Sequence, residues 1–161
     1  RARRAGCRSD GGRGVSANPA SVAAVHDAPR PLRPDLACIA EWVESQPLLA
    51  FSRLASLEFR CAVMRRVRSV ILTAVVADAA LERFAEDLQS GAFTLLPMLD
   101  EQVMAAEALL DRINVPLRAL DALHLAAAQS IRAQDFATAD RQLAVAAESL
   151  QLSVHYFGNL R

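Results

Sequence analysis

The feature that most constrains the fold is a regular alternation of short apolar runs with longer segments of helical periodicity. Strand-like runs occupy residues 21–26, 47–52, 93–99, 135–139 and 153–158. Helical spacing fills residues 35–45, 53–68, 70–90, 100–113, 117–133 and 140–150. Strands separated by helices need crossover connections, which build a parallel sheet covered on both faces. The alternation therefore predicts an α/β fold of three layers around a central parallel sheet of four or five short strands.

The domain organisation follows from length and local composition. A chain of 161 residues suits one domain, which we expect over residues 21–161. Residues 1–20 hold four of the six glycines and lack apolar periodicity. They predict a disordered basic tail or a non-native N-terminus, such as a shifted reading frame. No apolar core of a secretory signal is recognisable there.

Composition narrows the function classes. No apolar run approaches the roughly 20 residues that cross a bilayer, so no membrane segment is expected. The three cysteines lie far apart without Cys-x-x-Cys spacing, which fits a reducing cytoplasm and argues against a zinc or disulfide framework. Residues 35–161 hold eleven arginines against sixteen acids. Bulk charge therefore does not favour nucleic-acid binding, and a nucleic-acid substrate would need local arginines or bound cations.

Three acids stand where acids are uncommon, and the first is Glu58. It lies at the edge of an apolar stripe predicted on the 53–68 helix, formed by Leu54, Leu57, Cys61 and Met64. In this interpretation Cys61 is a packed thiol. A partly exposed Glu58 paired with Arg53 or Arg65 is the structural alternative to a functional role.

The second acid lies in the stretch LRALDALHLAAAQSIR, residues 117–132, which is apolar nearly all round. A buried Asp121 needs a partner, because burying an unpaired charge is costly. Its structural explanations are a salt bridge to Arg118 or a favourable place in the first helical turn. His124 lies on the same face, and a satisfied core histidine is the favoured interpretation.

The third acid is Asp140 in FATADRQL, which follows a strand and opens a helix. An N-cap role for Asp140 or Thr138 explains the position structurally. In a parallel sheet, however, the carboxyl ends of the strands form the crevice where ligands bind. Together, Glu58, Asp121 and Asp140 offer the carboxylate ligands that Mg²⁺ prefers.

The segments LASLEFRCAVMRR, LRALDALHLAAA and FATADRQLAVAAESLQLSVHYFG, in this order, closely resemble the PIN-domain family, in particular the VapC-type toxins of type II toxin–antitoxin pairs. The resemblance covers roughly residues 35–160. It implies a three-layer α/β/α PIN-like domain that acts as a cytoplasmic endoribonuclease with an acidic Mg²⁺ site, where Mn²⁺ can substitute. It also implies RNA as substrate and a cognate antitoxin that inserts into the active-site groove. We further expect a homodimer, for which the 70–90 and 100–113 helices could supply a face.

The family motifs assign the site residues. Glu58 matches the helix glutamate, Asp121 the acid of the DAxHLA helix, and Asp140 the acid of the TAD turn. Thr138 matches the threonine that supports this turn. The first-strand aspartate of the family, in a string such as DTSAL, has no clear counterpart, and Asp27 is a weak, displaced candidate. If Asp27 does not substitute, the alternative is a degenerate, weakly active or inactive domain that retains only antitoxin binding or self-association.

The resemblance also implies how the site works. The acids are expected to hold one or two metal ions, which lower the pKa of a bound water and neutralise charge on the phosphate. None of them is expected to act as a nucleophile. Phosphate binding is assigned to nearby arginines, for which a solvated helix face is the structural alternative. These arginines are Arg53, Arg60, Arg65, Arg66, Arg68 and Arg141.

Overall fold

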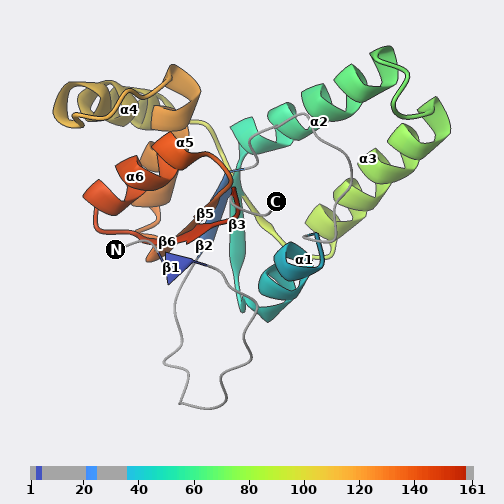
Figure 1. The fold of residues 1–161 in the computed structure, drawn as a ribbon, viewed down its shortest axis with the longest axis horizontal. Helices are drawn as coiled ribbons and strands as arrows, with labels where there is room; N and C mark the ends of the chain where they lie inside the picture. The colour runs from blue at the N-terminus through green and yellow to red at the C-terminus, as the bar shows by residue number, and fades with distance from the viewer. Residues whose placement is uncertain (1–2, 5–20, 25–35, 159–161) are drawn as a thin grey trace.

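A computed structural model of the chain describes residues 3–4, 21–24 and 36–158 and contains one parallel sheet with helices on both sides (Figure 1). The strands are β1 (Arg3–Arg4), β2 (Ser21–Ala24), β3 (Leu49–Ser52), β4 (Thr94–Leu96), β5 (Asp135–Thr138) and β6 (Ser153–Tyr156). The helices are α1 (Leu36–Ser45), α2 (Arg53–Arg68), α3 (Ala74–Gln89), α4 (Asp100–Arg112), α5 (Ala119–Ser130) and α6 (Arg141–Ser149). Helices α4–α6 lie on one side of the sheet and α1–α3 on the other, which confirms the predicted three layers.

The order of the strands identifies one edge of the sheet as the place for a ligand. Neighbouring strands run β1-β6-β5-β2-β3-β4, and all pairs are parallel. After β2 the chain adds β3 and β4 on one side and then returns to add β5 and β6 on the other. Ala24 of β2 pairs with Thr138 of β5, and the register with β3 brings Ser52 level with them. Because the strand order reverses at β2, ligands are expected beyond these carboxyl ends.

The larger core cluster lies around α5 and explains why that helix is apolar on nearly all sides. Its buried alanines, Ala122, Ala126, Ala127 and Ala128, are at most 1% exposed. Small side chains allow close approach, and α5 contacts α4, α2 and β2. Phe136 of β5 and Leu143 of α6 complete this core. Polar side chains on the inner faces of α5 are therefore held away from water.

The predicted apolar stripe on α2 is wrong. Leu57 is 58% exposed and Cys61 is also exposed, so its thiol is not packed. The buried residues of α2 are Ala55, Ala62 and Val63. Helical periodicity identifies the faces of α2 but does not tell which of them is buried. Mostly small residues form the buried face here, because α2 packs closely against β3, α3 and α5. Glu58 is three residues after Ala55 and four before Ala62, and therefore lies on this buried face.

The helix ends follow local capping rules. Helix α3 begins at Ala74 rather than residue 70, because the Thr73 side chain accepts a hydrogen bond from the Val76 N–H (3.3 Å) and caps the helix. Gly91 follows the C-cap residue Ser90 with φ of 78°, the left-handed conformation in which glycine ends helices. Local capping residues therefore determine where α3 begins and ends.

Two expectations concern the N-terminal part of the chain. Within residues 1–20, Arg3 and Arg4 form β1 beside β6, so the sheet has six strands rather than four or five. The other residues of this segment lie outside the described ranges, as does Asp27. Among the helices that the structure describes, none is long and apolar enough to span a membrane.

Candidate functional site

Asp121 occupies the first turn of α5. Its side chain is buried, and Oδ2 accepts a hydrogen bond from the backbone N–H of Arg118 (3.2 Å). This contact satisfies one of the N–H groups that a helix start leaves without an intrahelical partner, and the helix dipole favours the negative charge. The bond comes from the Arg118 backbone, not its guanidinium group, so the first-turn interpretation is supported and the salt bridge is wrong.

His124 connects the two helices that carry Asp121 and Glu58. Its side chain is 1% exposed, and Nε2 lies 2.8 Å from Oε2 of Glu58 on α2. The other ring nitrogen, Nδ1, lies 3.2 Å from Oγ of Ser52. The prediction of a satisfied core histidine is confirmed. The predicted pairing of Glu58 with an arginine is wrong, since its carboxylate contacts His124.

The geometry of the two helices explains this contact. Asp121 precedes His124 by three residues on α5, so both side chains lie on one face of that helix. Since His124 contacts Glu58, this face is turned toward α2. Two of the three predicted acids therefore come from facing sides of α2 and α5, although 63 positions separate residues 58 and 121 in the sequence.

Ser52 is a member of this site that the sequence analysis missed. It ends β3 and caps α2, and its Oγ accepts a hydrogen bond from the Ala55 N–H (3.2 Å). The side chain is fully buried. A serine between a strand and a helix is a recognisable N-cap, so the capping role was accessible from the sequence. Its contact with His124 was not, because the two residues are 72 positions apart.

Asp140 and Thr138 form a turn at the end of β5 that hydrogen bonds hold in place. The Asp140 side chain caps α6, with Oδ1 accepting hydrogen bonds from the N–H groups of Gln142 (2.7 Å) and Leu143 (3.1 Å). The buried Thr138 hydroxyl accepts from the Asp140 N–H (3.0 Å). The capping prediction is confirmed. Asp140 Oδ2 makes no hydrogen bond with any residue in the described ranges.

The carboxyl ends of two strands lead to the two parts of the site, the contact between α2 and α5 and the turn that holds Asp140. Ser52, which leads into α2, and Thr138, which leads to Asp140, end the strands on either side of β2. The expected phosphate-binding residues are mostly exposed: Arg53, Arg60, Arg65, Arg68 and Arg141 are exposed, and Arg66 is half-buried. The switch point of the sheet thus combines acidic side chains with arginines on the neighbouring helices.

The oxygen donors suit Mg²⁺ in kind, because hard divalent cations take carboxylate ligands. Their arrangement does not suffice. Across the part of the chain that the structure describes, no three His, Cys, Asp or Glu side chains form a group that could hold a metal ion. Glu58, Asp121 and Asp140 therefore do not make a metal site by themselves.

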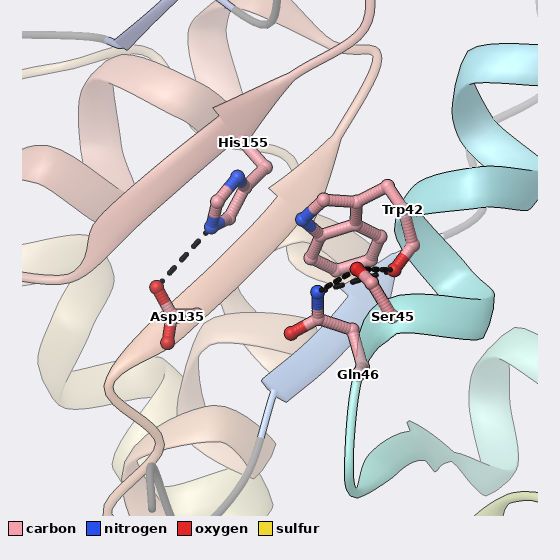
Figure 2. Close-up of polar contacts among 5 residues, drawn as sticks. All are labelled: Trp42, Ser45, Gln46, Asp135 and His155. Carbon is pink, nitrogen blue, oxygen red and sulfur yellow. Dashed lines mark hydrogen bonds and ion pairs between the residues drawn. The ribbon is translucent and has the colours of Figure 1, made fainter. Parts of the chain in front are cut away.

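A second histidine–carboxylate pair lies outside this site. Figure 2 shows His155 of β6 pointing toward Asp135 of β5, with Nε2 3.2 Å from Oδ1 and the ring of Trp42 from α1 beside it. Asp135 begins β5, about 10 Å along the strand from Thr138 at its carboxyl end, whereas His155 is level with Ala137 on β6, one strand further from β2. This pair offers a comparison within the same molecule.

Comparisons with known proteins agree with this architecture. A family model described as PIN domain matches residues 32–149. The solved structure of FitAB bound to an IR36 DNA fragment is similar over 88% of this chain and 97% of its own, with a TM-score of 0.61 and 18% identity. FitAcB from Neisseria gonorrhoeae is similar over 88% of this chain and 99% of its own, with a TM-score of 0.58 and 17% identity. No curated protein sequence matches this chain. At these identities the structural likeness shows the fold alone.

Proposed function

The chain belongs to the PIN-domain family, and from this we propose that it is a metal-dependent endoribonuclease that acts as the cytoplasmic toxin of a VapC-type toxin–antitoxin pair. The observation that carries the proposal is the approach of α2 and α5 at the carboxyl edge of the sheet. There Glu58 contacts His124 on the face that also holds Asp121. Asp140 follows the neighbouring end of β5. Members of the family are typically metal-dependent nucleases, and we propose that these three acids correspond to the acids of its active site.

The proposal assigns Glu58, Asp121 and Asp140 as ligands of Mg²⁺, with Mn²⁺ as a substitute. Asp27, which lies outside the described residues, is the proposed additional ligand, because the described acids do not suffice. Thr138 supports Asp140 through the hydrogen bond to its N–H (3.0 Å). Bound metal would supply an activated water and neutralise charge on the scissile phosphate. The arginines on α2 and Arg141 are proposed to hold the RNA backbone.

RNA cleavage with Mg²⁺, with and without EDTA, tests this function. We expect cleavage that EDTA abolishes and that Asp121→Asn reduces about 100-fold or more, since a buried carboxylate ligand is removed. Asp111→Asn is a matched control, because Asp111 is an exposed helical aspartate on α4. Cleavage that persists in EDTA, or full activity in Asp121→Asn, would contradict the metal-site account. Full activity in Asp27→Asn would remove Asp27 from the ligand set.

An exposed apolar surface supports the proposed protein partners. Where α2 and α3 meet, large apolar side chains are exposed, with Val70 reaching 91%. This α2–α3 surface consists of Leu57, Met64, Val70, Ile71, Val75 and Val76. Contiguous exposed apolar groups mark interaction sites in soluble proteins. A cognate antitoxin and a second copy of the chain are the proposed partners. FitAB, one of the similar solved structures, is bound to a DNA fragment.

A second candidate function is an inactive PIN domain that retains antitoxin binding or self-association. It is favoured by the lack of a three-residue metal group in the described ranges. The two candidates differ in the RNA assay, because only the first predicts EDTA-sensitive cleavage. Ile71→Asp, analysed by light scattering during gel filtration, tests self-association independently of that assay. A dimer that Ile71→Asp does not weaken would exclude the α2–α3 surface as its interface.

A further inference from the structure

Four groups from three segments form a continuous chain of hydrogen bonds at the candidate site. It runs from the Ala55 N–H to Ser52 Oγ (3.2 Å), from Ser52 Oγ to His124 Nδ1 (3.2 Å), and from His124 Nε2 to Glu58 Oε2 (2.8 Å). Ser52 and His124 are at most 1% exposed, so water does not compete for these contacts. The groups available as donors and acceptors fix the direction of the chain.

Only one proton arrangement satisfies every group. The Ala55 amide can only donate, so it uses one of the two lone pairs of Ser52 Oγ. Among the described residues, His124 Nδ1 is the acceptor available to the buried Ser52 hydroxyl proton, which is therefore directed to it. Nδ1 then accepts, and the ring proton is on Nε2, from which it donates to the Glu58 carboxylate. The other tautomer would place a lone pair of Nε2 against a carboxylate oxygen at 2.8 Å. A doubly protonated ring would leave the buried Ser52 hydroxyl without an acceptor among the described residues, which is costly.

We infer that Ser52 and His124 are positioning residues that hold the Glu58 carboxylate in one orientation for the reaction. Oε2 is committed to His124, and Oε1 makes no hydrogen bond with any residue that the structure describes. Oε1 is therefore the oxygen presented to a ligand. Because His124 lies on α5, the network also fixes Glu58 on α2 relative to Asp121. The consequence for catalysis rests on the proposed nuclease function, whereas the proton arrangement does not.

The proton arrangement is tested by nitrogen-15 NMR of the labelled full chain, which distinguishes the two tautomers of a neutral imidazole. We expect His124 to carry its proton on Nε2, and we expect Glu58→Gln to shift the Nε2 resonance, because a charge-assisted hydrogen bond becomes a neutral one. His124→Gln, which lacks the imidazole ring, identifies the His124 signal among the three histidines. A proton on Nδ1, or an Nε2 resonance unaffected by Glu58→Gln, would overturn the inference.

The positioning role is tested by a pair of substitutions that differ in one group. In His124→Gln the side-chain amide can donate from about the place of Nε2, whereas His124→Leu cannot donate. We expect RNA cleavage to fall about 10- to 100-fold in His124→Leu, the usual cost of removing a partner that orients a functional carboxylate, and to be largely rescued in His124→Gln. His155→Gln is the matched control, because His155 also pairs with a carboxylate but lies outside the site. Circular dichroism identifies variants that fail to fold.

The outcomes separate this inference from the proposed function. If the wild-type chain does not cleave RNA but His124 carries its proton on Nε2, the nuclease proposal fails and the proton arrangement is supported. If the wild-type chain cleaves RNA and folded His124→Leu cleaves equally well, the positioning role fails and the nuclease proposal stands. If both His124 variants fail to fold, the tautomer and the response to Glu58→Gln decide the inference.

Discussion

The two histidine–carboxylate pairs of the molecule have the same chemistry in different surroundings. His124 is 1% exposed and Glu58 is 18% exposed, and the pair joins two helices at the carboxyl edge of the sheet. His155 is 26% exposed and Asp135 is 13% exposed, and that pair joins two neighbouring strands. The first histidine has partners at both ring nitrogens, whereas the second rests its ring against Trp42, with centroids 4.9 Å apart (Figure 2).

The difference teaches what separates the pair that we propose to be functional from one that only joins two strands. The strands that carry Asp135 and His155 are already joined by their backbone hydrogen bonds, so this pair adds little to the fold. Within the described residues, no backbone hydrogen bonds join α2 to α5 at this point, so the side-chain contact of Glu58 with His124 is a direct polar link between the two helices. The Trp42 indole N–H near His155 is buried without a hydrogen-bond partner in the described ranges, whereas both ring nitrogens of His124 have partners. The proposed function of the His124–Glu58 pair therefore rests on its location in the fold and not on the identity of its two side chains.

The largest expected effect is on stability when each histidine is removed. His124→Leu should lower the free energy of unfolding by about 3 kcal/mol, since it leaves the buried Ser52 hydroxyl and the Glu58 carboxylate without their partner. His155→Leu should lower it by about 1 kcal/mol or less, because its pair is partly exposed. Urea unfolding followed by circular dichroism measures both. Equal losses would remove the distinction between the two pairs.

A smaller effect is expected at Asp140, where capping and catalysis can be separated. Asn caps helices about as well as Asp, so Asp140→Asn should change the free energy of unfolding by no more than about 0.5 kcal/mol, whereas Asp140→Ala should lower it by about 1 kcal/mol. RNA cleavage should fall strongly in both variants, because both lose the carboxylate. Thermal unfolding and cleavage rates measured on the same samples provide the comparison. If Asp140→Asn cleaves RNA normally, Asp140 caps α6 but has no part in cleavage.

The smallest effect is expected at the strand pair. Asp135→Asn should lower the free energy of unfolding by less than about 1 kcal/mol and leave RNA cleavage unchanged. Trp42 is the single tryptophan and lies against His155, so its fluorescence should report the altered pair. Fluorescence titration with urea measures the stability and the spectral change together. A loss of cleavage in Asp135→Asn would extend the functional region to this end of β5.

Local patterns predicted the elements of this fold well. The 53–68 helix has the predicted bounds, and the Asp140 cap and the buried His124 were expected from strand–helix boundaries and helix composition. These features depend on neighbours within about one helical turn, which the sequence displays directly. The start of α3 was misplaced because Thr73, rather than the preceding apolar residues, caps that helix.

The long-range contacts could not be obtained in the same way. Glu58 was expected beside an arginine on its own helix, but its partner is 66 positions away. Periodicity assigned the wrong face of α2 to the core, because large apolar residues such as Leu57 face solvent and small ones such as Ala55 are buried. The motifs of the PIN family pointed to the acids without indicating what surrounds them. The role of Ser52 could be recognised only from the order of the strands and from the contact between α2 and α5.

The most direct test of the central claim is a crystal soaked with Mn²⁺ and examined by anomalous diffraction. The account predicts an anomalous peak among the carboxylates of Glu58, Asp121 and Asp140, bound through Glu58 Oε1, and no peak at that place in crystals of Asp121→Asn. A fully soaked wild-type crystal without a peak among these three side chains would contradict the claim that they hold the metal of a nuclease.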